Sequence, residues 1–382
     1  MKKFREIFVT VMIFLLFFSA MAYGITWSTK KRLTNNEGGS GSPAIAVDGS
    51  NVYVVWCDDT PGNPELYFKK SVDGGITWTA GKRITHNAGN SMFPAIAVNG
   101  SNIYVVWEDS TPGNKEIYFK RSDDGGVTWA VGKRLSYREG QSMAPDIALN
   151  GSNIYVVWYD DRNLVRNRGI YFKRSDDGGI TWTAHERLTN NVGDSSLPAM
   201  AVEGSNIYIV WYYHISGTGY SDIYFKRSDN GGITWTADER LTNNIGDFSY
   251  PTIAVDGLNV YLIWHDNTSA EIYFKRSDDG GITWTVEERL THNSGFSVRP
   301  AIAVHGSNIY IVWEDSSSGN QEIYFKNSDD RGVTWTAGKR LTNNISSSYA
   351  PDIAADGSNV YVVWEDNRGG DYEIYFKKGN LY

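Results

Sequence analysis

The sequence predicts an all-β fold, a seven-bladed β-propeller of four-stranded antiparallel blades closed by the N-terminal strand completing the last blade. Three markers, each occurring seven times, support this prediction. They are a Thr-Trp dipeptide, a proline that opens an apolar run, and a Tyr-Phe-Lys tripeptide. Successive Thr-Trp dipeptides lie 49 to 53 residues apart. That spacing suits one four-stranded blade per repeat.

Each repeat contains four segments with strand character. In the first complete repeat they are residues 43–47, 52–56, 66–70 and 76–84. The turn beginning Asp48-Gly49 favours a tight hairpin between the first two segments. The second segment is apolar almost throughout, so it needs cover on both faces, which neighbouring propeller blades supply. Apolar residues show no helical period of 3.6, so we expect essentially no helix.

The order of these segments predicts how the ring closes. After a short N-terminal leader the chain begins with a fourth-strand segment, residues 25–34, and it ends just after a third-strand segment, residues 374–378. Each lacks its usual partner within its own repeat. Pairing them completes the seventh blade and removes two exposed sheet edges.

The N-terminus predicts export. Three basic residues within the first five precede an apolar stretch at 8–18, which is too short to span a bilayer comfortably, and Ala20-Met21-Ala22 suits signal cleavage. We therefore expect a signal peptide at 1–22, a single propeller domain at 23–382 and a secreted or extracytoplasmic location. The alternative is an uncleaved segment that anchors the chain.

Composition excludes several classes of function. The net charge is −8, from 36 basic and 44 acidic residues, and basic residues form no block, which argues against a nucleic-acid partner. Cys57 is the only cysteine, so no intrachain disulfide forms. The sequence has no zinc-ligand spacing, phosphate-binding glycine loop or Gly-x-Ser-x-Gly elbow. We expect no cofactor, no metal, no membrane-embedded part after signal cleavage, and a monomer.

Six turns between third and fourth strands share the pattern Ser-x-Asp-x-Gly-x-Thr-Trp, with Asn230 replacing the aspartate in one copy. The aspartate can accept hydrogen bonds from turn N–H groups, and the glycine supplies unusual φ. The copies begin at Ser71, Ser122, Ser175, Ser228, Ser277 and Ser328. This motif resembles the Asp box, or BNR repeat, of sialidases and related propellers, over nearly the whole mature chain. The resemblance implies a structural turn, usually remote from the catalytic face.

The resemblance to sialidases also implies a catalytic set, which this sequence lacks. Sialidases carry an Arg-Ile-Pro-like motif before the first box, three arginines, a Tyr–Glu nucleophile pair and an Asp acid. No such motif precedes the first box here. Arg32 has a counterpart in every repeat, so we interpret it as architectural, paired with a third-strand acid such as Glu373. We therefore assign no catalytic residue. If the protein is an enzyme, we expect a glycoside hydrolase of the exo-sialidase type.

A binding site needs residues that differ between repeats, and two places show such asymmetry. The residue before each repeated proline varies, and the loops between second and third strands are longest in the third and fourth repeats. Aromatic residues together with Asp and Arg suit sugar or peptide recognition. The candidate ligand-binding residues are Phe93, Asp160, Arg162, Tyr213, His214, Tyr250 and Arg299. A repeated Trp-x-Asp aspartate, by contrast, is interpreted as capping a solvated loop rim.

These observations favour a secreted, non-catalytic Asp-box propeller that binds a glycan or an extracellular protein on its loop face. Multivalent lectin behaviour, with one sugar per gap between blades, is a variant of this hypothesis. The alternatives are a sialidase-like glycoside hydrolase that uses loop carboxylates and a structural cell-surface component.

Overall fold

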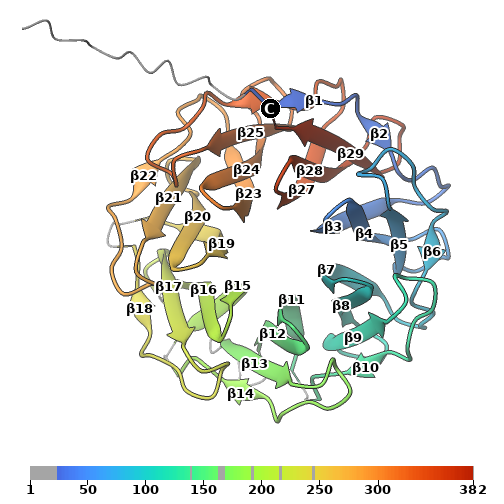
Figure 1. Ribbon diagram of the computed structural model, residues 1–382, viewed down its shortest axis with the longest axis horizontal. Helices are drawn as coiled ribbons and strands as arrows, with labels where there is room; N and C mark the ends of the chain where they lie inside the picture. Colours follow the sequence, from blue (N-terminus) through green and yellow to red (C-terminus); the bar gives the residue numbers. More distant parts are fainter. Residues whose placement is uncertain are drawn as a thin grey trace, which may run out of the picture.

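The computed structural model describes residues 24–137, 140–161, 168–190, 193–214, 217–242 and 246–381. Within these ranges all regular structure is β-strand, arranged as seven antiparallel sheets around a central axis (Figure 1). This arrangement confirms the predicted seven-bladed propeller. The described part of the chain contains no helix long and apolar enough to cross a membrane. The signal peptide predicted at 1–22 lies outside the described residues.

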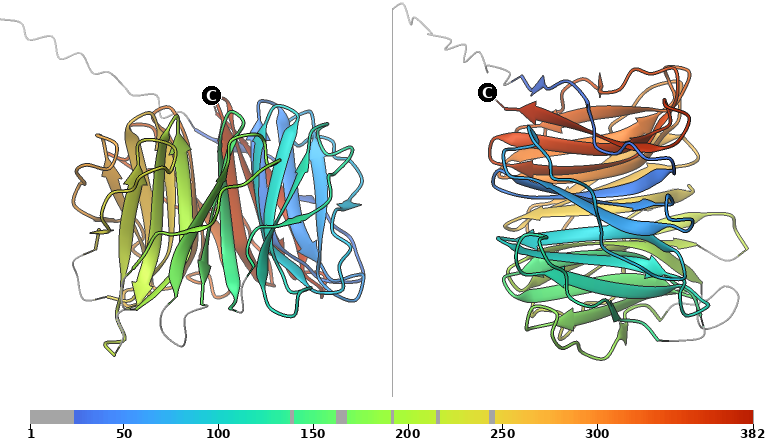
Figure 2. Two further views of the ribbon diagram at one scale, coloured as in Figure 1. Left: turned by 90° about the horizontal axis from the view of Figure 1, so that it is seen from below. Right: turned by 90° about the vertical axis from the view of Figure 1, so that its right-hand side faces the viewer.

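The strands of each blade follow one another from the centre outward (Figure 1). The innermost strands are β3 (Ser40–Asp48), β7 (Ser91–Asn99), β11 (Ser142–Asn150), β15 (Asp194–Glu203), β19 (Phe248–Asp256), β23 (Ser297–His305) and β27 (Ser348–Asp356). The second strands are β4 (Asn51–Asp58), β8 (Asn102–Asp109), β12 (Asn153–Asp160), β16 (Asn206–His214), β20 (Asn259–Asp266), β24 (Asn308–Asp315) and β28 (Asn359–Asp366). Seen edge-on, the strands run across the disc, so connecting loops gather on its two opposite faces (Figure 2).

The two outer positions of each blade are unequal in length. The third strands are β5 (Glu65–Ser71), β9 (Glu116–Ser122), β13 (Gly169–Ser175), β17 (Ser221–Ser228), β21 (Glu271–Ser277), β25 (Glu322–Ser328) and β29 (Glu373–Asn380). The fourth strands are β6 (Lys82–Arg83), β10 (Lys133–Arg134), β14 (Glu186–Arg187), β18 (Glu239–Arg240), β22 (Glu288–Arg289) and β26 (Lys339–Arg340). In the last blade this position is filled by β1 (Thr26–Trp27) and β2 (Lys31–Arg32).

The fourth strand is much shorter than the predicted segment 76–84. Only Lys82 and Arg83 pair with β5. The preceding residues belong to the Asp-box turn, where the Asp73 carboxylate accepts a 2.8 Å hydrogen bond from the Thr77 N–H. After the turn the Thr79 N–H donates to the Lys70 carbonyl of β5 at 2.9 Å, but this contact does not extend into a ladder, so the prediction of a continuous nine-residue strand is wrong.

The ends of the chain close the ring as predicted. Thr26 and Trp27 pair with Asn380 and Gly379, and the next short strand, β2, pairs with the same strand β29. Figure 1 shows both N-terminal strands beside β29. The Trp27 ring also packs edge-on against Phe325 of the sixth blade, with centroids 4.9 Å apart. The first described strands therefore contact two blades.

The core lies between the blades. Each second strand is apolar on both faces because each face packs on a different neighbour. Val54 belongs to a cluster shared with the last blade, whereas Val55 belongs to a cluster shared with the second blade. Both side chains are fully buried. The continuous apolar segments therefore mark strands that are sandwiched between two neighbours, as the sequence predicted.

The repeated polar residues are scaffold. In the Asp boxes, hydrogen bonds from the following threonine lower the pKa of Asp124 to about 2. The repeated arginine forms the predicted ion pair with a buried third-strand acid. These pairs are Arg32–Glu373, Arg83–Glu65, Arg134–Glu116, Arg240–Asp222, Arg289–Glu271 and Arg340–Glu322. They join third and fourth strands in places where only two residues pair.

Candidate functional site

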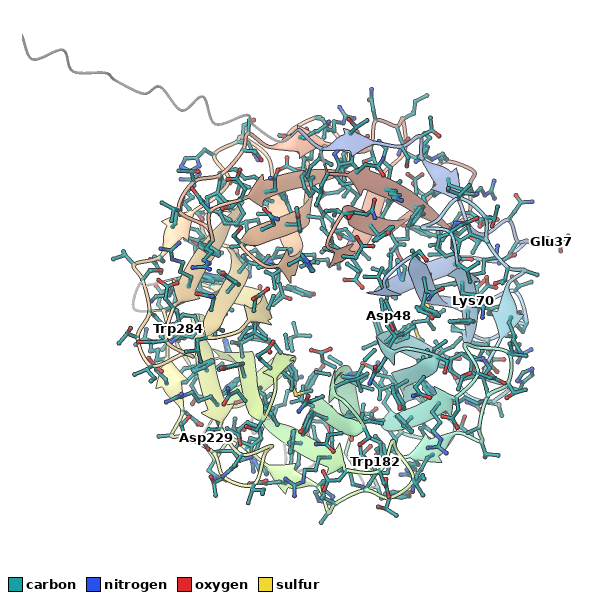
Figure 3. The ribbon with its side chains drawn as sticks, in the orientation of Figure 1. Glu37, Asp48, Lys70, Trp182, Asp229 and Trp284 are labelled. Carbon is teal, nitrogen blue, oxygen red and sulfur yellow. The ribbon has the colours of Figure 1, made fainter. Side chains whose placement is uncertain are left out.

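A cavity of about 710 Å³ lies at the centre of the propeller, walled by all seven innermost strands and by Glu365 of β28. Figure 3 shows the frame: Asp48, at the end of β3, lies near the centre, whereas Glu37 lies at the outer rim. The lining residues come from the first half of each innermost strand. Every blade therefore contributes a short segment to a single pocket.

A repeated backbone irregularity shapes the pocket wall. In each innermost strand the residue before the proline has a φ between 46° and 51°. L-residues rarely adopt this conformation, and a following proline disfavours it further. Pairing with the second strand shifts register at the same point, for example between Ser249 and Thr252. The seven residues, all of which line the pocket, are Ser42, Phe93, Ala144, Leu197, Tyr250, Arg299 and Ala350. The backbone is constant while the side chains vary.

The fifth and sixth blades form the most elaborate part of the wall. The Arg299 guanidinium lies over the Tyr250 ring, 5.8 Å from its centroid, and its Nη1 is 3.3 Å from Oε1 of Glu314. Tyr250 also stacks on His265, with ring centroids 5.3 Å apart. Burial lowers the pKa of His265, which disfavours the charged imidazolium form. This cluster offers a planar aromatic ring and a cation to the pocket.

Three carboxylates of the pocket wall hold neighbouring blades together. Asp146, Asp352 and Glu365 each accept a hydrogen bond from a backbone N–H of the next blade's innermost strand, at 2.7, 2.9 and 2.8 Å. Burial raises the pKa of both aspartates to about 6 and also raises that of Glu365. These acids therefore take up protons far more readily than exposed carboxylates.

Three of the predicted site residues line this pocket: Phe93, Tyr250 and Arg299. The Phe93 ring is 46% exposed and Tyr250 is 40% exposed, which is high for residues of their size. Lys115 lies over Phe93, with its Nζ 5.8 Å from the ring centroid. The structure therefore places two predicted aromatic residues and the predicted arginine on the wall of one cavity, with Tyr250 and Arg299 in contact and Phe93 on a different side of the ring.

The other predicted residues lie elsewhere. Asp160 is buried and accepts a 2.8 Å hydrogen bond from the Ser142 hydroxyl. Tyr213 packs edge-on against a tyrosine of β17, and His214 ends β16. None of them lines the central pocket. Arg162 lies outside the described residues.

The Trp-x-Asp aspartates do not form the predicted solvated rim. They are buried at the ends of the second strands, where five of them accept a hydrogen bond from the serine that begins the paired innermost strand and Asp266 accepts one from the Thr268 N–H. Asp109 shows the pattern, with 2.9 Å to the Ser91 hydroxyl and 2.5 Å to the Asn87 amide. It also caps the following loop through the Thr111 N–H at 2.9 Å. The prediction that these aspartates cap the following loops is confirmed. The prediction that they lie on a solvated rim is wrong, because they are buried.

Sequence reasoning missed the pocket acids, although a signal for two of them was present. The position after the repeated proline is Ala or Thr in five repeats but Asp at 146 and 352. Such a departure from the repeat is the asymmetry expected of a site. Glu365 carried no such signal, because glutamate occurs at the same place in other repeats. Across the ranges that the structure describes, no group of three or more His, Cys, Asp or Glu residues is arranged to hold a metal.

Residues 27–262, more than half of the chain, match the BNR repeat-like domain. The chain belongs to the BNR repeat-like family. A curated relative of this BNR propeller is a sialidase of Bacteroides fragilis, 23% identical over 261 residues. The match covers 56% of this chain and 45% of the sialidase, so it spans less than half of the relative's length.

Solved structures of glycoside hydrolases share the fold of this BNR propeller. The α-L-arabinanase of Penicillium chrysogenum, in complex with arabinobiose, aligns with a TM-score of 0.57 at 14% identity, covering 81% of this chain and all of its own. The GH93 α-L-arabinofuranosidase of Fusarium graminearum aligns with a TM-score of 0.57 at 12% identity, covering 93% of this chain and 98% of its own. Trypanosoma rangeli sialidase aligns with a TM-score of 0.53 at 13% identity, covering 78% of this chain and 55% of its own. At these identities the likeness establishes the fold alone.

Proposed function

We propose that this BNR propeller is an exported, non-catalytic protein that binds a glycan in its central pocket. The observation that carries the proposal is the convergence of Phe93, Tyr250 and Arg299 on one cavity of about 710 Å³. Small-molecule sites typically measure roughly 300–1,000 Å³. Exposed aromatic rings offer apolar faces to the C–H groups of a sugar, and a guanidinium donates to hydroxyl or carboxylate oxygens.

The pocket acids favour binding over catalysis. Glycoside hydrolysis needs two carboxyl groups roughly 5 to 9.5 Å apart, one of them free to give up a proton. Asp146 and Asp352 belong to β11 and β27, which lie on opposite sides of the ring (Figure 1). Each accepts two backbone N–H groups, one from its own strand and one from the next blade. Both oxygens of each carboxylate thus carry a structural hydrogen bond, one of which joins neighbouring blades.

A glycoside hydrolase is the second candidate, and one observation favours it. Asp352 and Glu365 line the same pocket from adjacent strands of the seventh blade, and burial raises the pKa of both. A carboxyl with a pKa of about 6 is a suitable proton donor near neutral pH. The fold relatives named above are glycosidases, which supports the same possibility. Replacing both acids by Asn and Gln would abolish turnover if this second candidate is correct.

The test is a glycan-array screen of the purified protein, with hydrolysis assayed on the same sugars. We expect binding without turnover. The triple variant Phe93→Ala, Tyr250→Ala, Arg299→Ala should bind about tenfold or more weakly, because it removes the aromatic faces and the cation. Tyr213→Ala is the matched control, since Tyr213 lies outside the pocket lining. Equal binding by the wild type and the triple variant would contradict the proposed site, and a silent array would redirect the search to an extracellular protein ligand.

A further inference from the structure

Two equivalent cavities lie between neighbouring blades, separate from the central pocket. One measures about 490 Å³ and lies between the last and first blades, and the other measures about 360 Å³ and lies between the first and second. Each is walled by a tryptophan, a tyrosine and a lysine of one blade and by the end of the preceding blade's fourth strand. The larger cavity has Trp56, Tyr67 and Lys69. The smaller cavity has Trp107, Tyr118 and Lys120.

A glycine opens each cavity. A Cβ atom at Gly81 would lie 3.6 Å from Cε of Lys69 and 3.7 Å from Cη2 of Trp56, in ordinary contact with both. At Gly132 the corresponding atom would lie 3.5 Å from Trp107. A longer side chain at either position would therefore project along the lysine and tryptophan that wall the cavity.

The fourth blade shows what such a side chain does. Asp238 stands at the position of Gly81, one residue before the fourth strand. Its Oδ1 lies 2.7 Å from Nζ of Lys226, which is the counterpart of Lys69. The protein itself thus places a carboxylate against this lysine in the fourth blade, Glu287 stands at the same position in the fifth blade, and glycine leaves the space open at positions 81, 132 and 338.

The lysines of the open cavities keep their position but have no carboxylate. Lys120 Nζ donates to the backbone carbonyl of Ile84 at 2.5 Å, and Lys69 donates in the same way to Leu33. Among the residues that the structure describes, neither lysine forms an ion pair. Burial lowers the pKa of both lysines; the charge of Glu65 opposes this shift for Lys120, and the charge of Lys31 adds to it for Lys69.

We propose that the cavities at Gly81 and Gly132 each bind a carboxylate-bearing sugar, a residue of the uronic acid class in an acidic polysaccharide. The sugar carboxylate takes the place that Asp238 occupies in the fourth blade and pairs with the lysine. The half-buried Tyr67 ring, which stacks on the fully buried Trp56 with centroids 5.9 Å apart, forms the apolar wall against which the sugar ring packs.

The sixth blade has the residues of a third site. A Cβ atom at Gly338 would lie 3.6 Å from Trp313, and Lys326 Nζ donates to a backbone carbonyl of the preceding blade at 2.7 Å. Repeated sites around one rim allow a single polysaccharide or a dense surface to bind with avidity. The cavities between blades share no lining residue with the central pocket, so this proposal does not depend on the function proposed above.

The test is a ligand-observed NMR titration of the purified protein with sodium glucuronate, with glucose and sodium acetate as comparison ligands. We expect glucuronate to bind more tightly than either. The variant Gly81→Asp, Gly132→Asp, Gly338→Asp should lose about tenfold or more in affinity, because each new carboxylate pairs with its lysine as Asp238 does. Gly369→Asp adds the same charge at a glycine with no atom near its Cβ position and should change nothing.

The reverse variant sharpens the test. Asp238→Gly should add a site in the fourth blade and raise the number of glucuronate molecules bound per protein by one. Unchanged affinity in the triple glycine variant would overturn the proposal, as would an absence of glucuronate binding. Acetate binding as tight as glucuronate would overturn the assignment to a sugar, because the aromatic wall would then contribute nothing.

Discussion

Arg299 connects the surface of the central pocket to the layer buried behind it. Its guanidinium covers Tyr250 on the pocket wall and is 3.3 Å from the Glu314 carboxylate, which is only 3% exposed. Burial raises the pKa of Glu314, and Arg299 opposes that rise. The arginine therefore has a structural role in addition to the proposed contact with ligand.

Replacing Arg299 with Ala should lower the free energy of unfolding by about 1–3 kcal/mol, because a buried carboxylate would lose its charged partner. Urea denaturation monitored by tryptophan fluorescence measures the change. Lys30→Ala is the control, since Lys30 is exposed and its Nζ lies 3.4 Å from Oδ1 of Asn344 in a contact open to solvent. A loss no larger than that of the control would contradict this role of Arg299.

Asp146 and Asp352 should make the stability depend on pH. Their folded-state pKa of about 6 lies above the ordinary value of 3.8, so the folded protein binds protons more tightly than the unfolded chain does. This contribution is stabilising near pH 4 and is lost as the pH rises to about 6. The Tm of the wild type, relative to the variant Asp146→Ala, Asp352→Ala, should therefore fall from pH 4.5 to pH 7. Alanine is a suitable replacement because four other blades carry alanine at the same position, directly after the repeated proline. A difference in Tm that is constant with pH would refute the raised pKa values.

At the scale of single elements, β1 and β2 are the strands that close the ring. They complete the seventh blade against β29, and Trp27 packs on the sixth blade. Without them, β29 would expose an unpaired edge and its underlying core.

Deleting residues 24–34 should lower the Tm by about 10 °C or more, because several kcal/mol of burial and strand pairing are lost. Differential scanning calorimetry measures the effect, and Ile345→Ala serves as a control because its side chain is fully exposed. An unchanged Tm after the deletion would contradict closure by these strands.

The boundaries of the elements show where sequence reasoning succeeds. The second strands can be predicted because their residues are buried on both faces and form unbroken apolar runs. In β4 (Asn51–Asp58) this run is residues 52–57. The innermost strands begin before the proline that the sequence suggested as their start, at Ser40 in the first blade. A proline usually ends or opens a strand. Here it follows a residue of positive φ inside the strand, and nothing in a single repeat signals that irregularity.

At the scale of the whole molecule, the repeat explains both the pocket and the limits of predicting it. A residue present in every blade can be recognised as scaffold. Arg83, which forms an ion pair with Glu65, is an example. Residues that vary at a fixed backbone position, such as Phe93 and Tyr250, are readable as candidates for a site. Tyr213 and His214 also differ from their counterparts in other repeats, but they extend β16 and pair with β15 and β17, so variation alone did not distinguish them from the pocket wall.

The central claim is that the propeller binds a glycan in the central pocket without cleaving it. The most direct test is a time course of one-dimensional proton NMR spectra of the tightest array ligand mixed with stoichiometric protein. We predict broadened ligand resonances that recover with the triple variant of Phe93, Tyr250 and Arg299, together with anomeric signals that stay constant over the time course. New anomeric signals from a released sugar would contradict the claim and establish a glycoside hydrolase.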